Sequence, residues 1–407
     1  MIRSLTKSLC PTLIVVVFIC LACFAGQSFA QEPAVESKPE TTAEAEKEPV
    51  EKTFANDGER ISLITKAVKR LVELQHDDGA WPYEGVYRVM NSERTERVIP
   101  VGYRIGGTSI VCSSLISAPI EDKSVVVDAV TKGVQMILKE LEHPLMKPSK
   151  TNRYDVRIWG HIYALDIFCR IKDRDEYKEV TEKTSEWIPK LVEAVTFQEV
   201  ENGGWNYANK RAHCCFVTGP AVQSLLLAKQ AGFEVADEVL GRAAEILISS
   251  RKDEEAVIPY TGTNSTRDTQ AGSVARAPVT EVTLTLLGRG DPERLEFTIE
   301  CFHKHWDELE KRRKKTGTHA RPHGIAPYFF YYAHRYAAQA IRMLPSTKQQ
   351  SEFDKFVPVM LRTKDEDNTW NDRVFEQSKA YGTAMSLLAL SRDSVQLPKS
   401  IKLKDAE

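Results

Sequence analysis

The sequence predicts an all-α protein in which about six pairs of helices close into a double ring. Two observations favour this fold class. No stretch of the chain alternates apolar and polar residues as a strand does, whereas helical patterns of roughly 12–18 residues follow one another. A similar corner also recurs between helices, which is typical of repeat architectures.

The recurring corner combines an apolar helix end, a polar turn and a tryptophan. Its copies are residues 71–83 (LVELQHDDGAWPY), 195–207 (VTFQEVENGGWNY), 359–370 (VMLRTKDEDNTW) and, with isoleucine in place of tryptophan, 254–260 (EEAVIPY). The repeat predicts that Trp81, Trp205 and Trp370 occupy equivalent corners and are largely buried.

After each corner comes a polar or basic loop and then a helix rich in small and apolar residues. These helices lie in residues 103–115, 156–168, 214–232, 274–288, 325–344 and 379–390. Such helices suit a crowded inner ring, which favours closure over an open superhelix, the competing arrangement. Thr218 is expected to cap one of them, and Gly232 to end it in a left-handed conformation. Asp291-Pro292 is expected to open a long helix that continues through residue 315.

The N-terminus has the pattern of a secretory signal peptide over residues 1–30. Arg3 and Lys7 precede an apolar run, and Ser28-Phe29-Ala30 supplies a small-x-small cleavage pattern. The run is too short for a spanning helix, so we expect contact with the membrane only through the cleaved signal. The protein is therefore expected to be exported, to the periplasm or the extracellular space.

The rest of the chain divides by composition. Residues 31–57 are rich in Glu, Pro, Thr and Lys and are expected to form a flexible linker. Residues 58–395 form the repeat domain, and residues 396–407 a C-terminal tail. Lys and Arg total 55 against 57 Asp and Glu, so nothing favours a nucleic-acid partner. The cysteines that remain after signal cleavage are too few and scattered for a disulfide framework.

The corner Gln75-x-x-Asp78-Gly79-x-Trp81, followed by a small-residue helix, resembles the repeat of the squalene and oxidosqualene cyclases and of the protein prenyltransferase β-subunits. The resemblance covers roughly residues 60–392. It implies the α/α toroid of these terpenoid cyclase-like proteins, with the working residues just ahead of the inner helices. The corner before Trp370 departs from the pattern, because Lys364 replaces Gln and Asn368 replaces Gly.

The chemistry of the cyclases is not predicted. The cyclases resemble each other in an acidic motif of the form D-x-D-D-T-A. Its carboxylic acid must stay protonated in a dry pocket in order to protonate an alkene. The openings of the inner helices in this chain contain no Asp or Glu. The acidic stretch Asp365-Glu366-Asp367 falls in a corner instead.

The prenyltransferases place Asp, Cys and His around zinc. Here His213, Cys214 and Cys215 precede an inner helix. Adjacent thiolates rarely meet at one tetrahedral centre, and a further ligand would have to come from His161 or His323. We expect no metal and no cofactor, and a structural role for the two cysteines. A zinc site and a thiol nucleophile are the alternatives.

One positive feature points to a ligand. Every loop that leads into an inner helix carries an Arg or a Lys, and in a closed ring these loops share one mouth with the helix N-termini. Aromatic residues at the same places would add flat, partly polar surface. The predicted ligand-binding residues are Arg104, Arg157, Trp159, His161, Arg211, His213, Arg276, His323, Tyr328, Lys379 and Tyr381.

Two functions follow as hypotheses. The first is a binding protein that accepts an elongated or anionic ligand, a small molecule or a polymer, in the ring. The second is an enzyme, a lyase or transferase acting on an acidic polysaccharide or a prenyl phosphate. Its acid or base would be His213, Tyr207 or His323.

Overall fold

The computed structural model describes residues 53–83, 87–88, 97–151, 154, 156–207, 211–252, 256–263 and 268–403. Residues 51–407 form one compact unit. The predicted signal peptide and nearly all of the predicted linker lie outside the described residues. None of the described helices is long and apolar enough to cross a membrane.

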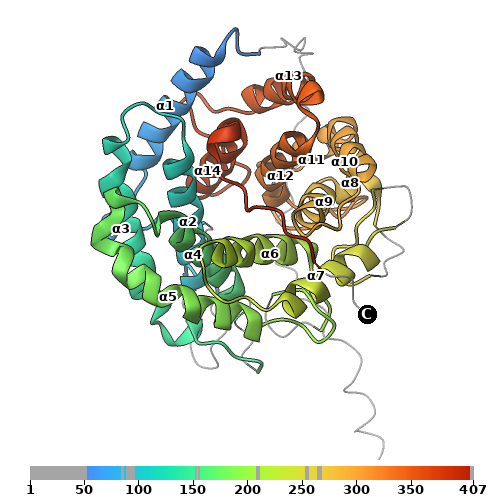
Figure 1. Ribbon diagram of the computed structural model, residues 1–407. Helices are drawn as coiled ribbons and strands as arrows, with labels where there is room; N and C mark the ends of the chain where they lie inside the picture. The colour runs from blue at the N-terminus through green and yellow to red at the C-terminus, as the bar shows by residue number, and fades with distance from the viewer. Residues whose placement is uncertain are drawn as a thin grey trace, which may run out of the picture. The chain divides into compact units, whose positions relative to one another are not determined.

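Within these segments, six helices form a closed inner ring, in which each contacts the next and the last returns to the first (Figure 1). In order they are α2 (Val101–Ser117), α4 (Arg157–Ile171), α6 (Cys215–Gln230), α9 (Ala277–Leu286), α12 (Phe330–Met343) and α14 (Ser378–Leu390). Nearly every residue of α2, α6 and α14 is buried, because these helices have neighbours on all sides. The predicted all-α toroid is confirmed.

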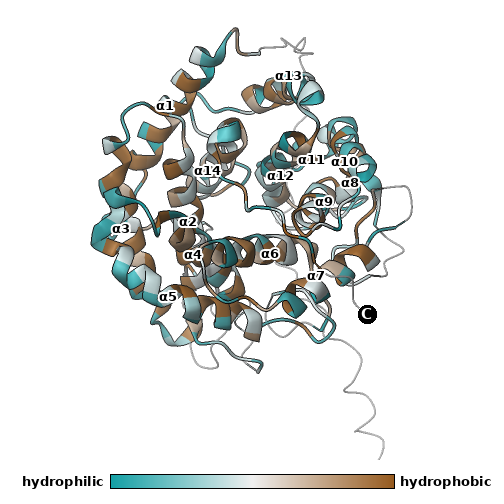
Figure 2. Ribbon diagram, in the orientation of Figure 1, coloured by the Kyte–Doolittle hydropathy of each residue, from teal (hydrophilic) through white to brown (hydrophobic). Residues whose placement is uncertain are grey.

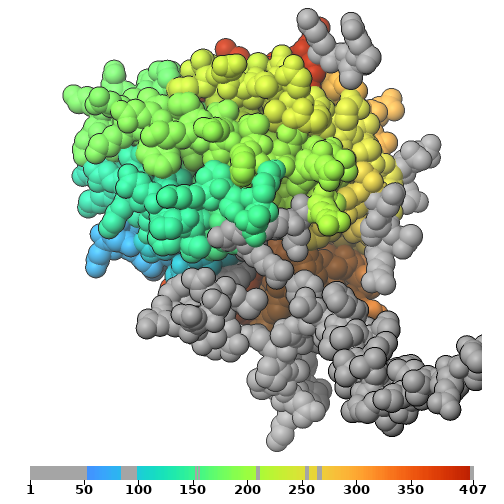
Figure 3. Space-filling model, turned by 90° about the horizontal axis from the view of Figure 1, so that it is seen from below, coloured from blue at the N-terminus to red at the C-terminus, as the bar shows by residue number. Residues whose placement is uncertain are grey.

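The outer helices pack on this ring and are amphipathic, with hydrophilic residues facing outward (Figure 2). They are α1 (Asp57–Glu73), α3 (Ser124–Leu141), α5 (Lys178–Phe197), α7 (Asp237–Ser249), α10 (Pro292–Lys304) and α13 (Ser346–Arg362). Viewed from the side, α5 and α7 form the upper part of the visible wall (Figure 3).

Short elements fill the connections. The short helices are α8 (Gln270–Ser273), α11 (Trp306–Glu310), and the 3-10 turns Pro144–Met146, Asp175–Tyr177, Pro327–Phe329 and Arg392–Ser394. Among the described residues the one ladder is an antiparallel pair of two-residue strands, β1 (Tyr87–Arg88) and β2 (Arg97–Val98).

The three tryptophan corners are equivalent and buried, as predicted. In each, the indole Nε1 donates to the carbonyl ten positions earlier, at 2.7 Å for Trp81, 2.7 Å for Trp205 and 2.9 Å for Trp370. The backbone N–H of each tryptophan also donates to a threonine hydroxyl of the following inner helix. The acceptors are Thr108, Thr218 and Thr383. Each tryptophan therefore joins the outer helix, through its indole, to the inner helix, through its backbone N–H.

A left-handed residue stands two positions before each tryptophan. Gly79 and Gly203 have φ of +88° and +97°, and Asn368 has φ of +63°. A Cβ at Gly79 would meet the Lys132 carbonyl oxygen at 2.6 Å, so the corner approaches the next outer helix more closely than a side chain allows. Asn is the usual alternative in this conformation, which explains the departure at Asn368.

Two expectations about helix boundaries are wrong, one about a cap and one about the length of a helix. Helix α6 already begins at Cys215, so Thr218 lies inside it and bonds the Trp205 corner instead of capping. The predicted long helix is two: α10 begins at the Asp291 cap but ends at Lys304, and α11 follows. Gly232 does end α6 with φ of +92°.

The C-terminal segment lies across the far end of the ring, where the inner helices finish. Ile401 N–H donates to the Leu286 carbonyl at 2.8 Å, and Arg170 donates to the Gln396 carbonyl at 2.8 Å. The segment thus connects the C-terminal ends of α9 and α4 (Figure 1). The opposite end, where the inner helices begin, is called the mouth below.

Candidate functional site

Several predicted cations of the mouth pair with carboxylates of this chain. Arg104 contacts Asp78 at 2.5 Å and Glu140 at 2.7 Å. Burial opposes the charge of Arg104, but these partners raise its pKa. Lys379 contacts Asp367 at 3.2 Å and Glu376 at 2.6 Å, and its pKa is also raised, chiefly through Glu376. Arg104 and Lys379 thus tie inner helices to the acidic turns of the corners.

The other predicted arginines differ in environment. Arg276 is buried and donates to the Ile258 carbonyl and to Asp268, each at 2.9 Å. Arg157 is also buried, and its Nε donates to the Leu145 carbonyl at 2.6 Å. Arg211 is exposed. The five predicted Arg and Lys side chains therefore do not form one continuous basic surface.

The three predicted histidines lie apart from one another. His213 is 2 % exposed and its Nε2 lies 2.7 Å from the Ser250 hydroxyl, so it is part of the interior rather than of the mouth surface. Burial lowers its pKa to about 4. His161 is buried and contacts Gln198, and burial lowers its pKa to about 3. His323 contacts the Thr269 hydroxyl at 2.9 Å.

The acidic turn cannot supply a cyclase acid. Burial favours the protonated form of Asp367, but hydrogen bonds from Thr369 and Lys379 prevail and hold its pKa at about 2. A general acid for alkene protonation would need the opposite shift. Asp365 pairs with Lys314.

The cysteines are free thiols in the structure. Burial raises the pKa of Cys214 to about 12 and of Cys215 to about 11, which is opposite to the shift that activates a nucleophile. Among the described residues no group of three or more His, Cys, Asp or Glu side chains could hold a metal ion.

The middle of the ring is occupied by side chains. Helices α12 and α4 lie on opposite sides of the ring of inner helices. The Arg335 guanidinium of α12 nevertheless lies 5.9 Å from the centroid of the Tyr163 side chain of α4. Gln223 of α6 and Gln339 of α12 exchange amide contacts at 3.4 Å. These residues are at most 5 % exposed. A ligand held at this level would have to displace them.

The aromatic residues of the mouth separate into two clusters. The first cluster joins the Trp81 corner, α4 and α14: the Trp159 ring centroid lies 5.1 Å from that of Tyr83, 4.9 Å from that of Tyr163 and 6.3 Å from that of Tyr381. All four are buried. The fold thus brings the predicted residues Trp159 and Tyr381 together. Both are buried and pack the beginning of α4 against the beginning of α14, so they do not offer an open aromatic surface to a ligand.

The second cluster is partly open to solvent and contains a hydrogen-bonded tyrosine–histidine pair. It consists of Tyr260, His319, Tyr328 and Phe329, and the Tyr260 and His319 rings lie 4.7 Å apart. His319 is exposed, while Tyr260 and Tyr328 are half-buried. We call these four residues the tyrosine–histidine cluster.

The geometry fixes the tautomer of His319. Its Nδ1 lies 2.9 Å from the Gly324 carbonyl, which can only accept, so Nδ1 carries the proton. Nε2 is then the acceptor for the Tyr328 hydroxyl at 3.1 Å. Partial burial of the imidazole and the nearby charge of Arg276 lower the pKa of His319, which favours the neutral ring at pH 7. The pair can therefore move a proton between Tyr328 and His319.

Cations lie beside this cluster. The Arg276 guanidinium is 5.8 Å from the Tyr260 ring centroid, and that of Arg373 is 5.7 Å from the Tyr328 centroid. Arg373 also lies over Phe375, which is 38 % exposed. Tyr207, a predicted acid or base, is half-buried at the same end of the ring.

Sequence reasoning found Tyr328 but missed His319, Tyr260 and Arg373. Two histidines lie in the loop before α12, and the sequence prediction named His323, because nothing in the spacing marks His319 as the one beside Tyr328. Tyr260 was visible only as the tyrosine of a degenerate corner. Arg373 follows a corner directly and has no signal of its own.

No protein-family model and no curated protein matches the chain. Solved structures do share its fold. An unsaturated glucuronyl hydrolase from Streptococcus agalactiae gives a TM-score of 0.55 at 13 % identity, over 87 % of this chain and 96 % of that one. An inactive variant of the α-1,6-mannanase from a Salegentibacter species, in complex with α-1,6-mannotetrose, gives 0.53 at 14 %, over 82 % and 98 %.

A third neighbour belongs to the predicted class. A type II terpene cyclase from Scytonema, in complex with its geranylgeranyl dihydroxybenzoate substrate, gives a TM-score of 0.50 at 11 % identity, over 83 % of this chain and 97 % of that one. The chain thus has the α/α-toroid fold that these three neighbours share. At these identities the similarity establishes the fold alone.

Proposed function

We propose that the protein is an eliminating lyase for an acidic polysaccharide and works at the tyrosine–histidine cluster. The observation that carries the proposal is the hydrogen bond from Tyr328 to the fixed, neutral Nε2 of His319. Two of the neighbours are named for reactions on sugars, a glucuronyl hydrolase and a mannanase, which agrees with a glycan substrate.

The chemistry is a β-elimination on a uronate. His319 accepts the Tyr328 proton, and the phenolate removes the hydrogen at C5. The C5 electron pair forms the C4=C5 double bond as the C4–O bond breaks, and the departing oxygen takes the proton from Tyr328. His319 then returns its proton to the Tyr328 phenolate, which restores the starting pair. Arg373, which is 9 % exposed beside the Tyr328 ring, would pair with the uronate carboxylate and stabilise the carbanion.

The test is an assay of polyuronates, such as alginate, polygalacturonate and hyaluronan, for ultraviolet-absorbing unsaturated ends. Replacing Tyr328 by Phe is expected to lower the rate by about 100-fold or more. Tyr177→Phe is the matched control, because Tyr177 is a buried tyrosine on a 3-10 turn packed against α3 and α5. Equal rates for wild type and Tyr328→Phe would overturn the assignment.

A non-catalytic binding protein for an anionic glycan is the second candidate. It is favoured by the exposed apolar side chains next to the cluster, since Val374 and Phe375 are 48 % and 38 % exposed beside Arg373. A thermal shift with a polyuronate, saturating at one equivalent and without release of unsaturated ends, would identify this function. Its loss in Phe375→Ala would place the ligand at the mouth.

Export is the remaining part of the proposal, because a polysaccharide substrate lies outside the cytoplasm. The support is the signal pattern of residues 1–30. Full-length protein should appear in the periplasm or medium with residues 1–30 removed. Retention of the intact chain in the cell would contradict this.

A further inference from the structure

The fourth corner of the ring differs from the three tryptophan corners in two residues. Ile258 replaces the tryptophan, although its backbone N–H still donates to the hydroxyl of Ser273 at 3.0 Å. Ala256 occupies the left-handed position two residues earlier, with φ of +48°. Gly79, Gly203 and Asn368 hold this place elsewhere.

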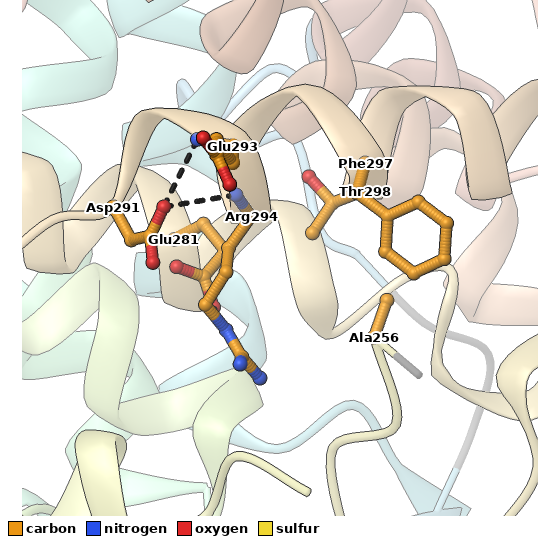
Figure 4. A pocket seen from close by; sticks show the side chains of 7 residues that line it. All are labelled: Ala256, Glu281, Asp291, Glu293, Arg294, Phe297 and Thr298. Carbon is orange, nitrogen blue, oxygen red and sulfur yellow. Dashed lines mark hydrogen bonds and ion pairs between the residues drawn. The ribbon is translucent and has the colours of Figure 1, made fainter. Parts of the chain in front are cut away.

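The methyl group of Ala256 changes how the corner meets its neighbour. A Cβ at Gly203 would lie 2.8 Å from the Arg242 carbonyl of α7, a distance that real side chains do not reach. Because Ala256 carries that Cβ, the fourth corner cannot approach α10 in the same way. A pocket with a volume of about 280 Å³ lies between them (Figure 4).

The pocket has two unlike walls. Phe297 and Ala256 form an apolar side, and Glu281 and Arg294 form a polar side across from it (Figure 4). Glu281 is 2 % exposed and is held by Arg251, whose Nε lies 2.9 Å from a carboxylate oxygen. Arg294 lies farther from Glu281, with its Nε at 3.8 Å, and donates to the Lys252 carbonyl at 3.1 Å, so its guanidinium has further N–H groups that can donate to a ligand.

The charges of the pocket favour a neutral ligand. The positive charges of Arg251 and Arg294, beside Glu281, disfavour a cationic ligand. The negative charges of Asp291 and Glu293, which also line the pocket, disfavour an anionic one. A ligand must still offer hydroxyl groups to the carboxylate and guanidinium and a flat C–H surface to the Phe297 ring. A pyranose ring has both.

We infer that the pocket between Ala256 and α10 binds one neutral sugar unit. Its lining shares no residue with the tyrosine–histidine cluster, so it is a second site, separate from the proposed lyase centre. It does not depend on the lyase activity. On a polysaccharide enzyme such a site would hold a neighbouring stretch of the polymer.

The experiment is saturation-transfer NMR on the full-length protein, processed as expressed, with D-glucose, D-mannose, D-galactose and N-acetylglucosamine as probes. D-Glucuronate and D-glucosamine are the charged comparisons. We expect at least one neutral sugar to bind and the charged ones to bind at least several-fold more weakly. Phe297→Ala should weaken binding by about ten-fold through loss of the aromatic wall.

Two variants separate binding from folding. Ala256→Asn keeps a residue that tolerates the left-handed conformation, as Asn368 does in its own corner, and places an amide in the pocket. It should abolish sugar binding without lowering the melting temperature. The matched control is Phe197→Ala, at an exposed phenylalanine of α5.

The outcomes are distinct. Binding that survives in both Phe297→Ala and Ala256→Asn, preferential binding of a charged probe, or no binding of any neutral probe would overturn the inference. Binding that is unchanged in Tyr328→Phe would support a site separate from the mouth, whether or not the lyase activity exists.

Discussion

The Trp205 corner and the tyrosine–histidine cluster lie at the same end of the ring but use their hydrogen bonds differently. Trp205 is fully buried, and both its N–H groups donate to partners at fixed places in two helices. The hydrogen bond between Tyr328 and His319 is partly open to solvent. The proton can therefore move from one residue to the other while the fold around them stays in place. Corner residues should therefore affect stability, and cluster residues activity.

The largest expected effect is at the corner. Trp205→Ala removes a buried indole and leaves the Val195 carbonyl without its Nε1–H donor. We expect a loss of about 3–5 kcal/mol in the free energy of unfolding. Urea denaturation at pH 7 measures it, and a loss below about 1 kcal/mol would show that the corner does not support the ring.

Next is the pH dependence of His213. Its pKa is about 4 in the folded protein against about 6.5 when unfolded. Between pH 6.5 and pH 4 His213 is protonated in the unfolded chain but neutral in the folded protein. Proton binding therefore favours the unfolded chain as the pH falls. The contribution of neutral His213 to the free energy of unfolding is complete above pH 6.5 and is lost as the pH falls toward 4. The loss is on the order of 3 kcal/mol. His213→Gln should flatten the stability curve between these values, and an unchanged curve would place His213 at the surface.

Thr218→Ala is expected to have a smaller effect. The hydroxyl accepts from Trp205 N–H at 2.9 Å, and its loss leaves one buried donor unpaired. The free energy of unfolding should fall by about 1 kcal/mol. Thr218→Ser keeps the hydroxyl and should recover most of the loss, whereas an equal loss in both would point to the methyl group.

The smallest effect on stability is expected at Arg211, which is exposed. Arg211→Ala should change the free energy of unfolding by less than about 0.5 kcal/mol. If a polyuronate binds at the mouth, the same variant should weaken binding more at low salt than at high salt, because screening is least there. A large change in melting temperature would assign Arg211 to the scaffold.

The sequence predicted the corners because their chemistry is local. Each corner needs a left-handed turn residue and a tryptophan at a fixed offset, and both are visible in the chain. The mouth was harder to predict, since its arginines had to be assigned partners from distant segments. Arg104 pairs with Asp78 and Arg276 with Asp268, and in a sequence a paired and an available arginine look the same. His213 was misplaced for a similar reason, because its partner Ser250 lies 37 residues away.

The closure of the ring also constrains how the chain can be made and varied. Arg60 in α1 donates to the Leu390 carbonyl at the end of α14, across 330 positions of sequence. An open array of repeats can gain or lose a unit and can fray from its ends, but a closed one has no ends. Nascent protein must therefore wait for α14 to be synthesised before its first helices find their final neighbours. Insertion or deletion of one helix pair would change the circumference of the whole ring.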